Sequence, residues 1–472
     1  MAGITSYGAY IPIYRLSRET INGVWGGTGK GEKAVANADE DSLTMGVEAA
    51  RDCIKGVEKD SIDALYFATT TPPYKEKQSA SIMAAACDLK EDIVTVDITD
   101  SIRSATIAIM MALDAVKAGS ARQVLVVAAD TRLGPPDTAF ESLFGDGAAA
   151  FLIGNEGVAV EIEGSTCITS EFVDYWRLEY DKIIRSWEDR FIREESYVPY
   201  VEKAVSALLK KQNMTAKDFS KAVIYSPDRR MQPAIVKSLG LDPKEQVQGL
   251  LFDTVGHTGT ALVPMVLVSA LEEAKAGDRI LVVNYGDGAD AHALRVTEEI
   301  GKLKDRRGIK GYLAFKIQLA NYGKYMRFRD LMEWEHDLFM ERRMALPEVW
   351  RHRNFYFRFY GVKCTKCGRI MVPPPNVCIY CQADEKYFEE VPLSDKQGKL
   401  VTYSMDVRSR ALDPPNVLAA VNFDGGGRFF SQMTDRDPDK IEIGMTMELT
   451  FRRIHDALGI HNYFWKCRPV RG

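Results

Sequence analysis

Residues 96–130, "VDITDSIRSATIAIMMALDAVKAGSARQVLVVAAD", contain the pattern that decides the fold. An apolar strand is followed by a tight polar turn, a long helix and a second apolar strand, an order typical of α/β proteins. Such a strand-to-helix turn is a common place for a nucleophile, because the first backbone N–H groups of the helix attract an anion. Here the turn contains Asp100, Ser101, Arg103 and Ser104, with no cysteine or histidine nearby. The pattern therefore predicts a site without an obvious nucleophile.

The same helix–strand unit occurs twice in the chain. Residues 112–119 (ALDAVKAG) recur as ALEEAKAG at 270–277, and a Gly-Asp-Gly-Ala core occurs in both FGDGAAAFLIG (144–154) and NYGDGADAHAL (284–294). Agreement of helix, strand and glycine-rich turn indicates an internal duplication. We therefore expect two similar halves, residues 1–165 and 166–300. Their continuous apolar runs predict strands buried on both faces at 63–70, 123–129, 148–154, 221–226 and 279–285.

Composition excludes several classes of protein. Of the 472 residues, 46% are hydrophobic and 27% charged, as in an ordinary globular protein. The net charge of -5 argues against a nucleic-acid binder, and no apolar run approaches the length of a membrane-spanning helix. Residues 1–17 lack the pattern of a signal peptide. We therefore expect a cytoplasmic protein with neither nucleic acid nor membrane as a partner.

Four cysteines in "KCTKCGRIMVPPPNVCIYC" have the spacing of a metal site. Cys364, Cys367, Cys378 and Cys381 form two CxxC pairs separated by ten residues, so that four thiolates can converge as a tetrahedral set. Zinc is favoured over a rubredoxin-type iron. All four ligands are sulfur atoms, which leaves no open position for water or substrate, so the metal is expected to be structural.

The rest of the C-terminal region predicts a linker and a barrel. Residues 302–353 are basic and aromatic, and we expect two helices there, within a linker spanning 301–355 that either is simply solvated or also touches a phosphate-bearing ligand. The ribbon is expected over 356–390. Residues 391–472 alternate polar and apolar positions between Gly and Pro turns, which predicts a small β-barrel.

A histidine lies in the second copy of the strand-to-helix junction. The stretch "DTVGHTGTALVPMVLVSAL" (253–271) lies opposite the opening stretch in the duplication. His257 would then lie near a helix start, where the positive end of the helix dipole keeps the imidazole neutral. Its position favours a functional role over a structural one.

With these residues in view, the first 300 residues resemble the thiolase superfamily, in particular the 3-hydroxy-3-methylglutaryl-CoA synthase and ketoacyl synthase III branch. The resemblance is carried by "DEDSLTMGVEAARDCI" (39–54), "FGDGAAAFLIG" and the strand end at 284–290. Residues 310–472 resemble the zinc-ribbon and OB-fold domain found beside such enzymes. The resemblance implies a duplicated five-layer α/β fold, followed by a helical linker, a zinc ribbon and an OB-fold barrel. It also implies a homodimer paired through the strand near 92–99.

The resemblance also identifies candidate catalytic positions. Such synthases use a Glu, a Cys and a His, and these align with Thr70, Ile102 and Tyr225. His257 stands where an Asn is usual, and Tyr285 lies in the loop where thiolases carry a second cysteine. The other cysteines, Cys53, Cys87 and Cys167, are expected in the core. A thiolate for acyl transfer is therefore missing from the expected place.

Cysteine-less relatives that pair with zinc-ribbon and OB domains include acyl-CoA aldolases that use tyrosines. By this resemblance Tyr225 would exchange a proton with a β-hydroxyl, Tyr285 would relay it and His257 would hold the thioester oxygen. Arg229 and Arg230 would bind the phosphates of coenzyme A, the carrier of the acyl substrate.

Three functions remain open on this basis. The first is a lyase, an aldolase or retro-aldolase acting on a β-hydroxyacyl-CoA. The second is a synthase-like acyltransferase with a displaced nucleophile. The third is a non-catalytic scaffold that holds CoA intermediates or partner enzymes.

Overall fold

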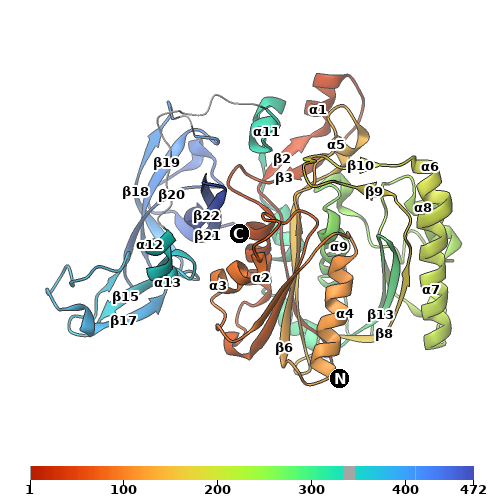
Figure 1. The fold of residues 1–472 in the computed structure, drawn as a ribbon, viewed down its shortest axis with the longest axis horizontal. Coiled ribbons are helices and arrows are strands. Elements are labelled where there is room, and N and C mark those ends of the chain that lie inside the picture. The colour runs from red at the N-terminus through yellow and green to blue at the C-terminus, as the bar shows by residue number, and fades with distance from the viewer. Residues whose placement is uncertain (1, 333–345, 410, 472) are drawn as a thin grey trace. The chain divides into compact units, whose positions relative to one another are not determined.

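The computed structural model describes residues 2–332, 346–409 and 411–471, which form two compact units (Figure 1). The first unit extends to Tyr322, apart from two short segments. The second unit contains the residues after Tyr322 together with those segments, Asn37–Glu40 and Ala85–Asp88. Among the described helices, none is both long enough and apolar enough to cross a membrane.

A nine-stranded sheet is the framework of the first unit, in the order β11-β12-β13-β8-β1-β7-β6-β4-β5. β1 pairs with β8 through Gly3 and Ile4, so two smaller sheets meet at this short contact. β4 is parallel to β5 and β6, whereas β7 is antiparallel to β1 and β6. The strands are β1 Gly3–Tyr10, β4 Ile62–Ala68, β5 Val94–Ile98, β6 Gln123–Asp130, β7 Gly147–Gly154, β8 Val160–Thr169, β11 Lys221–Ile224, β12 Arg279–Tyr285 and β13 Gly288–Val296.

Helices complete a layered arrangement (Figure 1). α2 (Ser42–Cys53) packs on β1, β6 and β7, and α7 (Val198–Gln212) packs on β8, β12 and β13. α4 (Ser104–Lys117) contacts β4, β6 and β7, while α9 (Leu262–Leu271) contacts β7, β11 and β12. α9 is apolar around its whole circumference, as a helix between two sheets must be. This order of layers confirms the predicted five-layer α/β fold.

The internal duplication is visible in the topology. The succession α4, β6, β7 in the first half corresponds to α9, β12, β13 in the second. β11 lies parallel to β12, as β4 lies parallel to β6. The five predicted buried strands are all present, although β11 ends at Ile224, two residues earlier than expected.

Shorter elements connect this framework. They are β2 Tyr14–Ser17, α1 Arg18–Trp25, β3 Glu32–Val35, α3 Ser79–Ala86, α5 Ala139–Leu143, β9 Tyr175–Trp176, β10 Arg185–Ser186, α6 Asp189–Phe191, α8 Gln232–Ser238, α10 Gly308–Leu313, β14 Ile317–Gln318 and α11 Tyr322–Phe328. Two helices are expected in residues 302–353, but the described residues there form four short α-helices: α10 and α11, with β14 between them, and α12 and α13, described below. Part of that prediction, 333–345, lies outside the described residues.

The second unit contains a ribbon and a barrel. The ribbon is formed by β15 (Tyr360–Cys364), β16 (Ile370–Met371) and β17 (Phe388–Pro392), and it follows α12 (Leu346–Arg351) and α13 (Arg353–Tyr356). Five strands form the barrel sheet in the order β20-β19-β18-β21-β22, and a bridge between Met433 and Cys467 joins its two ends. They are β18 Gly398–Asp406, β19 Asn416–Phe423, β20 Arg428–Gln432, β21 Thr446–Ala457 and β22 Ile460–Pro469. This is the predicted OB-fold barrel.

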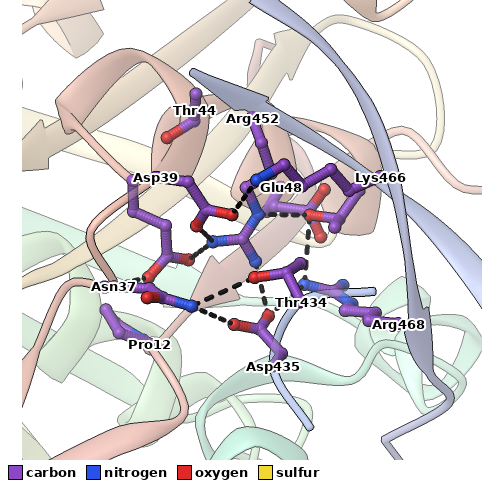
Figure 2. A network of polar contacts seen from close by, with 12 residues as sticks. Pro12, Asn37, Asp39, Thr44, Glu48, Thr434, Asp435, Arg452, Lys466 and Arg468 are labelled. Atoms are coloured by element: carbon purple, nitrogen blue, oxygen red, sulfur yellow. Dashed lines mark hydrogen bonds and ion pairs between the residues drawn. The ribbon is translucent and has the colours of Figure 1, made fainter. Parts of the chain in front are cut away.

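A buried ionic network ties the segment Asn37–Glu40 to the barrel within this unit (Figure 2). Arg452, fully buried on β21, contacts the carboxylates of Asp39, Glu40 and Asp435. Burial by itself would raise the pKa of Asp435, but Arg452, Arg471 and Arg468 hold that pKa well below its usual range. The carboxylate therefore remains charged and binds the arginines together.

Candidate functional site

The turn at residues 99–103 contains no cysteine. It joins β5 to α4, and Ile102 is buried at the position of the expected nucleophile, with 8% of its surface exposed. Gly286 lies against it: a Cβ atom at Gly286 would come within 2.7 Å of the Ile102 side chain. The turn and the glycine-rich loop after β12 therefore pack against each other where a nucleophile would otherwise lie.

Arg103 holds this turn in place. Its guanidinium donates to the carbonyl oxygen atoms of Ile168 (3.1 Å) and Asp287 (3.0 Å) and lies 3.1 Å from the sulfur of Cys167. Cys167 is exposed on β8, so its expected place in the core is wrong. Cys53 and Cys87 are buried as predicted.

Tyr225 and His257 form a buried pair. Tyr225 follows β11 directly and its N–H donates to Val283, while His257 precedes the short turn that leads into α9. The Nε2 atom of His257 lies 3.1 Å from the Tyr225 hydroxyl oxygen, and the N–H of Gly259 donates to Nδ1 of His257 at 3.1 Å. Because Nδ1 is an acceptor, the neutral imidazole carries its proton on Nε2 and donates it to Tyr225.

Burial keeps both groups of the pair uncharged. Burial, reinforced by the nearby cation of Arg132, lowers the pKa of His257 to about 3. Burial also raises the pKa of Tyr225 well above its usual value. At neutral pH the pair is therefore a neutral imidazole that donates to a neutral phenol.

Tyr285 lies between Tyr225 and the buried carboxyl group of Asp174 in the chain of contacts. The two tyrosine rings are 5.9 Å apart between centroids, and the Tyr285 hydroxyl donates to Ser196 at 2.7 Å. Burial raises the pKa of Asp174, although the Tyr175 N–H and the Tyr285 hydroxyl oppose that rise. A buried carboxyl whose pKa lies above its usual value accepts a proton more readily than an ordinary Asp does.

Asp130 organises the opposite side of the site. Its fully buried carboxylate accepts hydrogen bonds from the hydroxyls of Thr69 (2.9 Å), Thr70 (2.9 Å) and Thr71 (3.0 Å) and from the N–H of Thr260 (2.7 Å). Thr70, aligned with the expected glutamate, therefore has its hydroxyl committed to Asp130. The contact fixes the segment 69–71 against the turn that follows His257.

The predicted CoA-binding arginines lie in exposed positions. Arg230 pairs with Asp228 (2.6 Å) and Asp189 (3.2 Å), and Arg229 pairs with Asp253. Arg230 lines a pocket of about 430 Å³ whose wall also includes Tyr175. The pocket therefore extends from the exposed guanidinium of Arg230 to Tyr175, which lies near Tyr225.

The four ribbon cysteines converge. Their sulfur atoms all lie within 4.8 Å of one another, with 3.7 Å between Cys364 and Cys381 and 3.6 Å between Cys367 and Cys378. Four thiolates around one zinc would be separated by roughly 3.8 Å, given Zn–S bonds of about 2.3 Å in a tetrahedron. The donor set therefore fits a four-coordinate metal.

The structure thus brings Tyr225, His257 and Tyr285 together, and their catalytic roles stay predictions. Asp174 and Arg132, which sequence reasoning missed, lie in loops where no periodic pattern distinguishes them. Asp130 carried a usable signal, because it directly follows a run of buried apolar residues at the end of a predicted strand.

Family comparisons agree with this architecture. Residues 96–172 match the family described as 3-oxoacyl-[acyl-carrier-protein (ACP)] synthase III, and residues 209–297 match its C-terminal family. Residues 357–386 match the rubredoxin-like zinc ribbon domain of ChsH2, and residues 390–452 match the C-terminal OB-fold domain of ChsH2. The fold and the site define a thiolase-like protein with a fused zinc ribbon and OB domain.

Similar proteins narrow this class. The hydroxymethylglutaryl-CoA synthase of Methanocaldococcus jannaschii is 35% identical over 341 residues, which cover 70% of this chain and 99% of that relative. The chain belongs to the hydroxymethylglutaryl-CoA synthase family. The synthase of the same name from Aeropyrum pernix is 35% identical over 341 residues, 70% of this chain and 94% of its own.

Solved structures share the fold. A crystal structure of an HMG-CoA synthase complexed with CoA superposes with a TM-score of 0.64 at 18% identity, covering 73% of this chain and 95% of that chain. The 3-oxoacyl-[acyl-carrier-protein] synthase III of Aquifex aeolicus superposes with a TM-score of 0.56 at 22% identity. The superposition covers 62% of this chain and 100% of that chain.

Proposed function

We propose that this protein makes or breaks a carbon–carbon bond beside a CoA thioester, as an aldolase or retro-aldolase acting on a β-hydroxyacyl-CoA. The observation that carries the proposal is the Tyr225 hydroxyl, 3.1 Å from a neutral His257, in the position where the resemblance expects a histidine. Ile102 stands where the thiol would be. Family membership supports acyl-CoA chemistry, and the tyrosine pair favours the lyase over acyl transfer.

The side chains of the site suggest a route for the protons. In the cleavage direction the β-hydroxyl proton moves to Tyr225, whose own proton passes through Tyr285 to Asp174. The Cα–Cβ bond breaks, its electron pair enters the thioester as an enolate, and the β-carbon leaves as a carbonyl compound. The proton held by Asp174 then returns through Tyr285 and Tyr225 to Cα of the enolate, which gives the shortened acyl-CoA and restores the site.

His257 acts on the substrate through Tyr225 in this proposal. Its one N–H points at the Tyr225 hydroxyl, so it orients the phenol rather than holding the thioester oxygen as first expected. The enolate oxygen would instead be stabilised by backbone N–H groups at the start of α4. Arg229 and Arg230 would bind the CoA phosphates at the exposed end of the pocket.

A second candidate is a synthase-like acyltransferase. The names of the relatives favour it. It requires a nucleophile at another position than Ile102, and Ser101 in the turn and Cys167 beside Arg103 are a hydroxyl and a thiol close to that position.

Substitution of Tyr225 tests the proposal. Tyr225→Phe removes the proton-transferring hydroxyl and should lower kcat for cleavage of a 3-hydroxyacyl-CoA by about 100-fold or more. Chromatography of the acyl-CoA product, with mass detection, measures the rate. The affinity for CoA, measured by calorimetry, should not change.

Tyr197→Phe is the matched control. Tyr197 packs in the same aromatic cluster, with its ring 6.4 Å from that of Tyr225, but its hydroxyl donates to the Tyr225 backbone carbonyl. This variant should retain most of the activity. Equal activity in parent and Tyr225→Phe, or equal losses in both variants, would contradict the proposed role.

We further propose a structural zinc on Cys364, Cys367, Cys378 and Cys381. Four sulfur ligands complete the coordination of zinc, so the ion would stabilise the ribbon and take no part in catalysis. Reduced thiols are needed to bind it, which fits a cytoplasmic location.

A further inference from the structure

One turn of π-helix lies beside the two tyrosines of the site. It covers Ile192–Tyr197 and joins α6 to α7, and the N–H of Val198 donates to the carbonyl oxygen of Arg193, five residues earlier. Pro199 accounts for the wider turn, because it has no N–H and its ring would collide with the preceding turn of an unbroken α-helix. Single π-turns of this kind occur frequently at functional sites.

Two consecutive buried residues of this turn each contact one of the tyrosines. The Tyr285 hydroxyl donates to Oγ of Ser196 at 2.7 Å. The Tyr197 hydroxyl donates to the backbone carbonyl oxygen of Tyr225, also at 2.7 Å. Of these two bonds, the first involves the hydroxyl of a proposed proton carrier and the second involves backbone. Ser196 can therefore affect proton transfer directly, whereas Tyr197 cannot.

The Tyr285 hydroxyl has one hydrogen atom and two acceptors. Ser196 is one acceptor, and the buried carboxyl group of Asp174, which also hydrogen-bonds to this hydroxyl, is the other. When Tyr285 passes its proton to Asp174, its oxygen is negatively charged until the proton of Tyr225 arrives. A serine hydroxyl can accept or donate, so rotation about its Cβ–Oγ bond allows Ser196 to donate to the Tyr285 oxygen at that moment.

The surroundings of Tyr285 make such a donor necessary. Burial and the nearby charge of Asp174 raise the pKa of Tyr285, whereas the hydrogen bond to Ser196 opposes that rise. A phenolate is therefore unfavourable here, and a hydrogen bond to the charged oxygen stabilises it.

We infer that Ser196 is a positioning residue of the proton relay, which fixes the Tyr285 hydroxyl at rest and donates to the phenolate oxygen during transfer; the inference rests on the proposed lyase function. The Tyr285 O–H bond breaks as an O–H bond forms on Asp174. The Tyr225 O–H bond then breaks as the one on Tyr285 forms again. Ser196 keeps its own proton throughout.

Steady-state kinetics of the full-length protein with 3-hydroxybutyryl-CoA test this inference. Ser196→Ala removes one oxygen atom and adds no bulk, so the fold should persist, which thermal unfolding checks. We expect kcat to fall about 10- to 100-fold, as for loss of a hydrogen bond to a charged group, while KM stays unchanged. Ser6→Ala removes a buried serine hydroxyl outside the site, which donates to the carbonyl oxygen of Cys53, and should leave kcat unchanged.

Two further readouts separate positioning from a structural effect. The solvent isotope effect on kcat, measured in H2O and D2O, should be larger in Ser196→Ala than in the parent, because proton transfer becomes the slow step. In Tyr285→Phe, which lacks the relaying hydroxyl, the additional Ser196→Ala change should cause no further loss of activity, since Ser196 acts through Tyr285. Unchanged kcat in Ser196→Ala, equal isotope effects in the two proteins, or additive losses in the double variant would each overturn the inference.

The outcome is separable from that of the proposed lyase. Full activity in Ser196→Ala together with loss of activity in Tyr225→Phe would leave the lyase standing and remove the role of Ser196. A parent protein that does not cleave 3-hydroxybutyryl-CoA would contradict the lyase and, with it, the relay.

Discussion

The Tyr225–His257 contact depends on a single tautomer of the histidine. The Gly259 N–H occupies Nδ1, and a φ of +59° at Gly259 gives the backbone the conformation that directs this N–H inward. A side chain at Gly259 would also collide with Asp130, within 2.2 Å of its carboxylate. One glycine therefore sets the proton position of His257 and, through it, the orientation of the phenol.

The buried His257 makes stability depend on pH. The unfolded imidazole takes a proton near its ordinary value of 6.5, whereas the folded one has a pKa of about 3. The unfolded state binds more protons between these values, so the free energy of unfolding falls as the pH decreases through this window. We expect a loss of about 2 kcal/mol between about pH 7 and about pH 5 from this group.

Urea unfolding of parent and His257→Asn at the two pH values measures this loss. The variant should show a smaller decrease in stability, since it lacks the titrating imidazole. His352→Asn, which changes an exposed histidine, should behave as the parent does. The same decrease in His257→Asn as in the parent would mean that His257 is already charged in the folded protein.

The sequence made some of these residues predictable. Tyr225 and Tyr285 lie at the ends of predicted apolar strands, and His257 lies in a glycine-flanked turn at a duplicated junction, so local pattern identified all three positions. Arg132 and Asp174 come from irregular loops that approach the site only after the chain has folded. The tautomer of His257 likewise depends on a local backbone conformation that the sequence does not specify.

Among the elements, β5 is an edge strand of the large sheet. It pairs with β4 on one side, and Val94 at its start is 62% exposed. We propose that β5 pairs with the same strand of a second copy, as the family resemblance implies. An exposed apolar edge strand is prone to such pairing.

Val94→Arg should produce a monomer. The substitution places two like charges close together across the proposed two-fold axis, which disfavours association. Light scattering of the eluted protein measures the mass, with Val407→Arg on the second unit as a control for a new surface charge. A monomeric parent protein, or an unchanged dimer in Val94→Arg, would count against β5 as the interface.

At the scale of the whole molecule, the duplication predicted two similar halves, the family resemblance implied the five-layer fold and the CxxC spacing predicted the ribbon. α9 could be placed centrally from its uniformly apolar sequence, because only a helix covered on all sides tolerates such a surface. The assignment of Asn37–Glu40 to the second unit could not be predicted, because it depends on contacts with residues about 400 positions later in the chain, such as Asn37 with Asp435.

The ribbon should depend on its metal independently of the first unit. Cys364→Ser removes one of four zinc ligands and should unfold the ribbon while the first unit remains folded. Metal analysis and limited proteolysis followed by mass spectrometry would show loss of zinc and cleavage within residues 357–392. Cys167→Ser, which changes an exposed cysteine outside the ribbon, should retain zinc, and retention of zinc in Cys364→Ser would contradict the four-thiolate site.

The central claim is that the protein acts on acyl-CoA without forming an acyl-enzyme. Intact-protein mass spectrometry after incubation with acetyl-CoA tests it most directly, with Ile102→Cys as a variant that restores a thiol to the turn and Cys167→Ser as a variant that removes the nearby one. We predict that the parent and Cys167→Ser remain unmodified while the parent still cleaves a 3-hydroxyacyl-CoA. An acyl adduct on the parent, mapped to Ser101 or Cys167, would contradict the claim.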